Sequence, residues 1–272
     1  MLARGSVSVG SEPPNNFAEA ILTRVVVNGA GKLGRAIIAA SLEQDGPVSV
    51  VAAVDRAEVE DLPVPLYSSL DLVTEDFDVL IDASRAEGLE TVLEFAAREN
   101  KPLLIAATGH SGPQLEALEE AAQQIPVLLS SNLSIGVNVV RALTEAAGKM
   151  LGPVDAEIVE THHRMKVDAP SGTALTLAQT LRDATDPQRE FVYGRTPEDD
   201  SARGNEIGIH AVRGGSVVGE HSVKFLLDDE IVEIRHVAQS RKIFGSGALR
   251  AAQFIQHQAP GLYEMADLLV AD

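Results

Sequence analysis

Short apolar runs alternate with amphipathic stretches along the first half of the chain. Five runs have the length and composition of buried strands, at residues 25–27, 48–54, 79–81, 103–106 and 127–129. Between these runs, apolar side chains recur at helical spacing, as they do over residues 33–42. Strands that alternate with helices in this way predict a doubly wound parallel sheet.

Two capping boxes are expected to open helices in this region. Ser84 is followed three residues later by Glu87. Ser111 is followed at the same distance by Gln114. In a capping box the serine accepts from a backbone N–H of the first turn, and the glutamate or glutamine side chain reaches back to the serine backbone. Each pair therefore predicts where a helix begins.

The pattern changes after about residue 133. A long helical stretch at 136–151 precedes a strand of alternating apolar and polar residues at 156–161. A last helix is expected at about 247–257, where Pro260-Gly261 stops it. We expect this helix to pack back on the first domain.

Three further β-rich runs occupy residues 207–213, 217–227 and 230–236. Gly214-Gly215-Ser216 separates the first two runs, and Asp228-Asp229 separates the last two. Both separators suit hairpin turns, so the runs are expected to pair as neighbours. The second half is therefore predicted to be an α+β domain with a mainly antiparallel sheet.

Composition narrows the possible partners. The 22 Lys and Arg residues against 40 Asp and Glu give a formal net charge of −18, which repels nucleic acid and anionic membranes. The absence of Cys excludes disulfides, thiolate nucleophiles and the common zinc ligand sets. No apolar run approaches the roughly 18 residues needed to span a bilayer, and the first residues lack a secretory pattern. We expect a soluble, cytoplasmic protein.

A glycine-rich turn follows the first predicted strand. Gly29-Ala30-Gly31-Lys32-Leu33-Gly34 fits the G-x-G-x-x-G pattern that lets backbone N–H groups approach a pyrophosphate. Asp55 ends the second strand 21 residues after Gly34 and suits a ribose hydroxyl, whereas Arg56 suits a 2′-phosphate. The pattern predicts a Rossmann-like domain that binds NADH or NADPH. The alternative is a tight βα turn without a ligand.

Residues 161–173 contain two histidines and two cationic side chains just before a predicted helix start. If the strand persists through His163, the side chains of His162 and His163 point to opposite faces. His162 and Lys166 are the acid and base candidates, because an imidazole titrates near neutrality and an ammonium can donate a proton. The N–H groups of Gly172 and Thr173, at a helix start opened by Pro170, suit a carboxylate. No metal site is expected. The alternative is a solvated loop in which Asp168 and Ser171 cap the helix.

The segment at 162–175, HHRMKVDAPSGTAL, closely resembles the signature of the 4-hydroxy-tetrahydrodipicolinate reductase family, also called dihydrodipicolinate reductase. The resemblance extends from about Arg24 to the C-terminus. It takes in residues 29–34, Ile81-Asp82, Thr108-Gly109, Ser131-Asn132, residues 218–221 and residues 235–238.

The resemblance implies an enzyme of lysine and diaminopimelate biosynthesis. Such an enzyme uses NADPH or NADH to reduce the cyclic dicarboxylate 4-hydroxy-tetrahydrodipicolinate, with loss of water, to tetrahydrodipicolinate. By resemblance His162 is the proton donor and acceptor and Lys166 a second proton donor. His163, Gly172 and Thr173 then bind the substrate.

The resemblance also implies where the cofactor lies. The residues concerned are the loop Asn28-Gly29-Ala30-Gly31-Lys32-Leu33-Gly34, then Asp55, Arg56, Ala106, Ala107, Thr108, Ser130, Ser131, Asn132 and Leu133. The last seven form two turns that follow predicted strands, as ligand-binding turns in such sheets do.

The expected organisation is a flexible tail at 1–23 and two domains. A dinucleotide-binding domain spans 24–132 and is completed by 240–272, and a domain for substrate binding and oligomerisation spans 133–239. Family resemblance implies a homotetramer. The lone histidines at 210, 221, 236 and 257 are expected to be structural, and Arg213, Lys224, Arg235 and Arg241 to form surface ion pairs.

Two alternatives stay open. Another nicotinamide-dependent reductase of a small amino or keto acid would share the first domain, but the His-His-Arg-Met-Lys run at 162–166 counts against it. A non-catalytic NAD(P)H sensor would have no use for a proton-donating His162 and Lys166.

Overall fold

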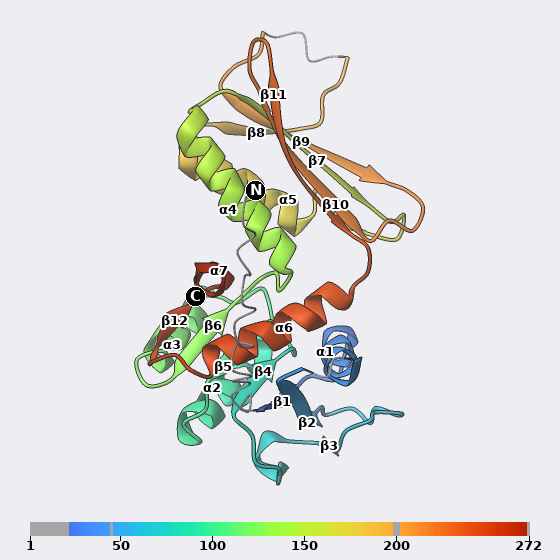
Figure 1. The fold of residues 1–272 in the computed structure, drawn as a ribbon, viewed down its shortest axis with the longest axis vertical. Helices are drawn as coiled ribbons and strands as arrows, with labels where there is room; N and C mark the ends of the chain where they lie inside the picture. The colour runs from blue at the N-terminus through green and yellow to red at the C-terminus, as the bar shows by residue number, and fades with distance from the viewer. Residues whose placement is uncertain (1–21, 44–45, 198–201, 271–272) are drawn as a thin grey trace, which may run out of the picture.

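The chain folds around two β-sheets, one below the other in Figure 1. The computed structural model describes residues 22–43, 46–197 and 202–270. The predicted tail lies outside the described residues as far as residue 21, and the first strand already begins at Thr23. Within the described ranges, none of the helices combines the length and apolar character of a membrane span.

The first sheet is parallel throughout its seven strands. In spatial order they are β12 (Gly261–Tyr263), β6 (Pro126–Leu129), β5 (Leu103–Ile105), β4 (Val79–Asp82), β1 (Thr23–Asn28), β2 (Val48–Val54) and β3 (Leu66–Tyr67). The chain runs outward from β1 to β3 and then returns to β4, so the order reverses between β1 and β4. The doubly wound prediction is confirmed, and ligands of such sheets bind at that reversal.

Helices cover both faces of this sheet. On one face lie α1 (Lys32–Glu43) and α6 (Lys242–Ile255), and on the other lie α2 (Leu89–Arg98) and α3 (Gly112–Ala121). Val25 and Val27 of β1 pack in the first core and Val26 in the second, because successive strand side chains point to opposite faces. The sheet is therefore buried on both sides, which explains the continuous apolar runs in the sequence.

One of the two predicted capping boxes forms. At Ser111 the backbone N–H donates to Oε1 of Gln114 over 2.9 Å, and α3 begins there. The prediction at Ser84 is wrong, since a 3₁₀ turn (Ala86–Gly88) comes first, without a side-chain cap from Arg85, and α2 begins only at Leu89. The Ser84 hydroxyl instead donates to the buried Asp82 carboxylate over 2.6 Å, a partner that pattern reading could not foresee.

The second sheet is mixed. Its spatial order is β11 (Ile231–Ala238), β10 (Gly219–Leu226), β7 (Asp155–His162), β9 (Glu206–Arg213) and β8 (Glu190–Tyr193). The β11–β10 and β10–β7 pairs are antiparallel, and the β7–β9 and β9–β8 pairs are parallel. The sheet thus joins an antiparallel half to a parallel half.

The hairpin predicted at Asp228-Asp229 forms, but the hairpin predicted at 214–216 is wrong. Strand β7 lies between β9 and β10, so those two strands do not pair. The intervening loop wraps the end of β7: the Gly214 N–H donates to the His162 carbonyl, and the His163 N–H donates to the Val217 carbonyl. Hydrogen bonds to β7 thus replace those of a closed hairpin.

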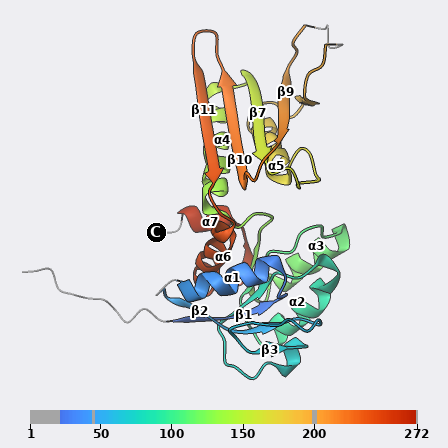
Figure 2. The same ribbon diagram turned by 90° about the vertical axis from the view of Figure 1, so that its right-hand side faces the viewer.

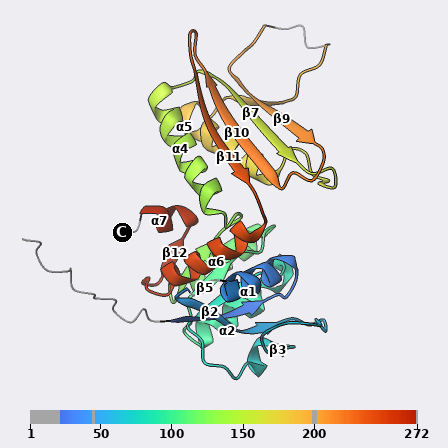
Figure 3. The ribbon, with the colours of Figure 1, turned by 45° about the vertical axis from the view of Figure 1, so that its right-hand side comes forward.

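Two helices pack on the same face of the second sheet, as Figures 2 and 3 show. These are α4 (Ile135–Leu151) and α5 (Gly172–Thr185). Val140 of α4 and Leu177 of α5 share a core with Ile158 of β7 and Phe225 of β10. We call this covered side the inner face, and the side without a described helix the outer face.

The C-terminal segment returns to the first sheet. Helix α6 crosses so close to α1 that a Cβ on Gly245 would lie 2.3 Å from the carbonyl oxygen of Ala36. The last strand, β12, pairs with β6, and Met265 of α7 (Met265–Val270) enters the same core as α1. Helix α6 thus packs on the first sheet, as expected for the last predicted helix. The domain limits at 24–132, 133–239 and 240–272 stay a prediction.

Candidate active site

The glycine-rich loop makes a tight turn between β1 and α1. Gly29 has φ = +99°, and a Cβ there would lie 2.7 Å from the carbonyl oxygen of Ala83. At Gly34 a Cβ would lie 1.9 Å from the Gly29 carbonyl oxygen. A Cβ on Gly31, in contrast, would meet nothing within 4 Å. The loop is closely packed on its protein side and open at Gly31, which is the shape that a pyrophosphate needs.

Asp55 ties the end of β2 to this loop. Its Oδ2 accepts from the Ala30 N–H over 2.8 Å, and its Oδ1 accepts from the Ala57 N–H over 3.0 Å. The carboxylate is therefore fixed beside the loop. Arg56 is exposed and makes no hydrogen bond or ion pair with the described residues.

Asp82 supports the same loop from the end of β4. Its carboxylate is fully buried and accepts from the Asn28 amide over 2.9 Å and from the Ser84 hydroxyl. Burial raises the pKa of the Asp82 carboxyl, although these hydrogen bonds act against the shift. The Asp82 carboxylate therefore holds Asn28 in place. Sequence reasoning named Asp82 only within the Ile81-Asp82 segment of the family resemblance and gave it no role.

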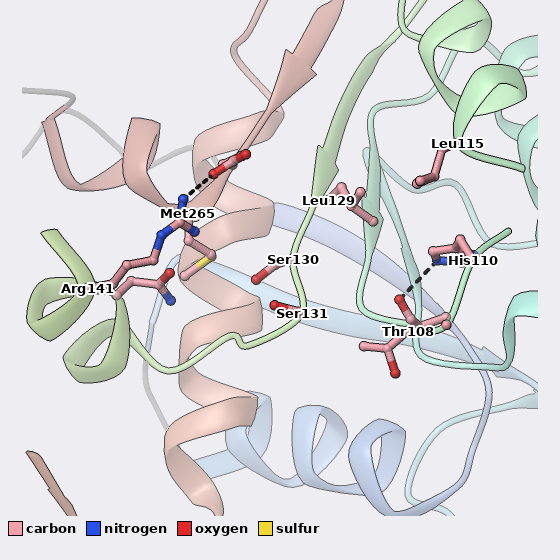
Figure 4. Close-up of a pocket in the computed structure, with 12 residues that line it drawn as sticks. Thr108, His110, Leu115, Leu129, Ser130, Ser131, Arg141 and Met265 are labelled. Atoms are coloured by element: carbon pink, nitrogen blue, oxygen red, sulfur yellow. Dashed lines mark hydrogen bonds and ion pairs between the residues drawn. The ribbon is translucent and has the colours of Figure 1, made fainter. Parts of the chain in front are cut away.

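Two turns after β5 and β6 share a cavity of about 320 Å³, shown in Figure 4. Its wall includes four predicted cofactor residues, namely Ala107, Thr108, Ser130 and Ser131. Ala106 is half-buried under the first turn, and Leu133 is buried after the second. The rest of the wall comes from residues that sequence reasoning missed: Gly109, His110, Leu115, Leu129, Asn138, Arg141, Glu264 and Met265.

The missed wall residues come from distant elements. In Figure 4, Arg141 of α4 and Met265 of α7 stand on one side of Ser130, and His110 stands on the other. Arg141 pairs with Glu264 over 2.9 Å. No local sequence signal links α4 to the C-terminal segment, so only the fold brings these residues together.

The cofactor candidates thus lie at the carboxyl ends of β1, β2, β5 and β6 of one sheet. The loop glycines leave room for backbone approach, the Asp55 carboxylate is fixed, and a cavity adjoins both remaining turns. These features fit a nicotinamide dinucleotide.

His162, at the end of β7, belongs to a buried network on the inner face. Its Nδ1 lies 2.5 Å from Oε2 of Glu160, a side chain with no exposed surface. Arg213 of β9 donates to both oxygens of Glu160, over 2.6 and 2.8 Å. The Ser171 N–H donates to Oε1 of Glu160 over 2.9 Å. Strands β7 and β9 and the start of α5 are therefore joined through one carboxylate.

This carboxylate is ionised because of its partners. Burial alone would raise the pKa of Glu160, but hydrogen bonds from Arg213, His162 and the Ser171 amide hold the pKa below its usual value. The prediction that Arg213 forms a surface ion pair is wrong, because its partner is the buried Glu160.

Sequence reasoning also missed Glu160, although a signal was present. Along β7, Ala156, Ile158, Glu160 and His162 are all buried, and the residues between them are more exposed. A glutamate that shares the buried phase of an alternating strand must find partners. The alternation that identified the strand could therefore have identified Glu160.

His221 of β10 lies next to this network. Its ring meets the His162 ring edge-on, with centroids 5.2 Å apart, and its Nε2 lies 3.1 Å from the Ser171 hydroxyl. Burial, together with the nearby charge of His162, lowers the pKa of His221 to about 4. His221 is therefore neutral at physiological pH.

The remaining substrate candidates lie in the loop after β7 and at the start of α5. The Lys166 ammonium is 2.9 Å from Asp168, and His163 accepts from Arg241 over 3.1 Å. Ser171 caps α5, which begins at Gly172, as the capping interpretation expects, while the catalytic interpretation of this segment stays a prediction. No hydrogen bond joins Lys166 directly to His162 among the described residues.

One hydrogen bond joins the two halves of the candidate site. The side-chain amide of Asn132, in the turn after β6, donates to the Thr173 hydroxyl at the start of α5 over 3.0 Å. The predicted cofactor turn and the predicted carboxylate site are therefore adjacent. Over the described ranges, no group of three or more His, Asp or Glu side chains is arranged to hold a metal ion.

Together these features define a class of protein. A glycine-rich loop at the reversal point of a parallel sheet, next to a second sheet with a paired histidine and a helix start, is the arrangement of a nicotinamide-dependent oxidoreductase with a separate substrate-binding part.

The chain belongs to the dihydrodipicolinate reductase family. Residues 23–133 match the family model described as Dihydrodipicolinate reductase, N-terminus, and residues 136–269 match Dihydrodipicolinate reductase, C-terminus. The resemblance found in the HHRMKVDAPSGTAL segment is therefore confirmed.

Two relatives named 4-hydroxy-tetrahydrodipicolinate reductase align with this chain over nearly their whole length. The 4-hydroxy-tetrahydrodipicolinate reductase of Caldanaerobacter subterraneus subsp. tengcongensis is 45% identical over 92% of this chain and 99% of its own. That of Clostridium tetani is 38% identical over 92% and 98%.

Solved structures share the fold. The dipicolinate-bound dihydrodipicolinate reductase of Paenisporosarcina sp. TG-14 superposes with a TM-score of 0.77 at 23% identity, over 92% of this chain and all of that one. An engineered D-amino acid dehydrogenase bound to NADP+ superposes with a TM-score of 0.55 at 16% identity, over 92% and 96%. The Rossmann-like fold with a second domain is thus common to both.

Proposed function

We propose that this enzyme uses NADPH or NADH to reduce 4-hydroxy-tetrahydrodipicolinate to tetrahydrodipicolinate, with loss of water, in lysine and diaminopimelate biosynthesis. The observation that carries the proposal is the hydrogen bond between Asn132 and Thr173. It places a helix start suited to a carboxylate beside the turn proposed for the cofactor. Family membership and the close relatives named 4-hydroxy-tetrahydrodipicolinate reductase support the choice of substrate.

The cofactor would lie along the carboxyl ends of the first sheet. The loop at 28–34 would hold its pyrophosphate, Asp55 and Arg56 its adenosine ribose, and the turns at 106–108 and 130–133 its other half. When bound there, the reduced nicotinamide supplies a hydride. The chain provides the rigid loop and the cavity that fix its position.

The substrate is a dianion, and the second half of the site offers it donors and positive charge. The N–H groups of Gly172 and Thr173 at the start of α5, which have no hydrogen-bond partner in the described part of the chain, would bind one carboxylate. His163, held by Arg241, would contact the ring substituents. Because the N–H groups are fixed by the helix, they bind the anion without reorganising.

Proton transfer is assigned to His162 and Lys166. With Nδ1 of His162 bound to Glu160, its Nε2 is the nitrogen left to give or accept a proton. The Lys166 ammonium, paired with the exposed Asp168, would donate a second proton and balance developing negative charge. Protonation of the leaving hydroxyl would release it as water.

The test is oxidation of NADPH and of NADH, coupled to a synthase that makes the unstable substrate in place. His162→Ala and Lys166→Ala should each lower kcat by about 100-fold or more, while cofactor affinity changes by less than about 3-fold. His257→Ala, in the exposed turn after α6, and Lys149→Ala, on an exposed position of α4, are the matched controls. Cofactor binding without turnover in the wild type would favour a sensor, and turnover only of another amino or keto acid would favour a different reductase.

We also propose that the enzyme is a cytoplasmic homotetramer assembled through the outer face of the second sheet. Three apolar side chains stand exposed on its strands: Ile231 (63%), Val237 (47%) and Val212 (47%). An uncovered sheet face with such side chains suits a partner sheet. Light scattering after size exclusion should give four chains per particle, and a monomeric Val237→Glu variant would place the contact there. Cell fractionation tests the location.

A further inference from the structure

We infer that Glu160 is a positioning residue for His162, held rigid by Arg213 and Ser171, which fixes the imidazole with its proton on Nδ1 and its Nε2 free for the reaction. The inference rests on the proposed function only in that it gives His162 a proton-transfer role. It concerns a residue that acts through another and does not itself contact the substrate.

The geometry leaves the carboxylate little freedom. Glu160 and His162 are two residues apart on β7, so both side chains point to the inner face. Oε2 of Glu160 receives His162 and Arg213, and Oε1 receives Arg213 and the Ser171 N–H. Donors from three elements therefore prevent the group from turning, and a rigid acceptor orients the ring that it contacts.

The charge of the carboxylate decides the tautomer. An ionised carboxylate only accepts hydrogen bonds, so the nitrogen that faces it must carry the proton. The pairing with Arg213 keeps Glu160 ionised. Among the described residues Nε2 of His162 makes no hydrogen bond, which leaves it available.

Space around Nε2 is kept open by Gly219 of β10. A Cβ at that position would lie 2.9 Å from Nε2 of His162, so a larger residue would cover the reactive nitrogen. The titratable or charged groups that face this ring are Glu160 on its own strand, Arg213 on β9 and His221 on β10, and Lys166 in the following loop lies near enough to act on His221. His221 adds no charge near neutral pH, so Glu160 is the anion that faces the imidazole.

Strand β7 supplies a matched control. Glu157, on the outer face, also pairs with an arginine and a histidine, namely Arg195 and His210. The two glutamates therefore have similar partners and belong to the same strand, but only Glu160 touches His162. If removal of any carboxylate from this strand lowers activity, substitutions of Glu157 and of Glu160 should lower it alike.

The first experiment uses the unmodified protein. In NMR spectra of ¹⁵N-histidine-labelled enzyme, with His162 assigned by comparison with His162→Gln, the neutral ring should carry its proton on Nδ1. A proton on Nε2 overturns the inference. This measurement needs no variant at 160, so it decides the matter even if such a variant fails to fold.

The second experiment compares Glu160→Gln with Glu157→Gln in the coupled assay. Glu160→Gln should lower kcat by about 30- to 100-fold with KM values within about 3-fold, because the ring is misoriented while the binding residues stay. Glu157→Gln should keep kcat and KM within about 3-fold of wild type, and light scattering checks that this variant on the outer face keeps the wild-type assembly.

Equal losses of kcat in the two variants overturn the inference while leaving the proposed function in place. A wild-type enzyme without reductase activity rejects the proposed function instead. In that case the NMR tautomer alone decides whether Glu160 orients His162.

Discussion

The two sheets carry their functional groups in different places. In the first sheet the strand interiors are apolar on both faces, and the proposed cofactor residues lie in turns just after β1, β2, β5 and β6. In the second sheet the polar groups lie within the strands, since Glu160, His162 and His221 are buried on the inner face.

The difference reflects two kinds of recognition. The first sheet offers backbone N–H groups and close-packed glycines, so its chemistry depends on main-chain shape. The second sheet offers side chains, and each buried charge requires a partner, as Glu160 requires Arg213. Substitutions should therefore act through shape in the first sheet and through charge and hydrogen bonding in the second.

The largest effect should come from Gly34→Ala. The new Cβ would lie 1.9 Å from the Gly29 carbonyl oxygen, so the loop must move. A misplacement of about 1 Å can cost about 100-fold, and we expect a loss of that size in NADPH affinity, measured by fluorescence titration. Gly31→Ala is the control for stability, because its Cβ meets no protein atom within 4 Å. Wild-type affinity in Gly34→Ala would mean that shape does not govern this loop.

The second sheet should respond to pH through His221. Its folded pKa of about 4 lies below the unfolded value of 6.5, so protonation favours the unfolded chain. Its contribution to stability is present above pH 6.5 and is lost as pH falls toward 4. The loss is at most about 3 kcal/mol, from 1.36 kcal/mol per pKa unit. Urea unfolding between pH 7 and 4.5 should show a steeper decline in wild type than in His221→Gln, and parallel curves would contradict the burial of a neutral ring.

Much of the first sheet could be predicted from the sequence. Its central strands are buried on both faces and therefore read as apolar runs, which places β1, β2 and β4 within about two residues. Strands β3 and β12 were missed because they have only two and three residues and lie at the edges. At such lengths the alternation that identifies a strand cannot be seen.

The topology of the second sheet could not be predicted in the same way. The turn residues at 214–216 suit a hairpin, and no local feature shows that β7 would lie between the strands that flank them. Pairing between distant strands is decided by which side chains the sheet must bury. The sequence patterns located β7, β9, β10 and β11 but missed β8 and the order of the strands.

The candidate site likewise contains residues with a local sequence signal and residues that only the fold brings together. The glycine loop, Asp55 and the start of α5 have local signals, because each depends on a few consecutive residues. Arg213 and Arg141 gain their places only through contacts with β7 and the C-terminal segment. Residues of this kind become visible only when the fold is known.

A smaller effect is expected where the two sheets meet. Asn132→Ala removes the hydrogen bond to Thr173 and should weaken binding of dipicolinate, a planar dicarboxylate, by about 5-fold, since one such bond contributes about 1 kcal/mol. Thr173→Val should cost a similar factor, and the double variant should cost little more than either alone. Calorimetric titration with NADPH present measures each affinity. Fully additive losses would show that the two side chains act separately.

The smallest effect is expected at Arg56, just after β2. Here a side chain, and not the backbone, would distinguish NADPH from NADH. Arg56 has no protein partner among the described residues and adjoins Asp55, so its guanidinium is free to meet a 2′-phosphate. Arg56→Ala should raise KM for NADPH by about 2- to 5-fold, the range of an exposed ion pair, and leave KM for NADH unchanged. Arg98→Ala, on α2, controls for loss of surface charge. Equal changes with both cofactors would show that Arg56 does not distinguish them and would leave the fixed Asp55 carboxylate as the candidate for that choice.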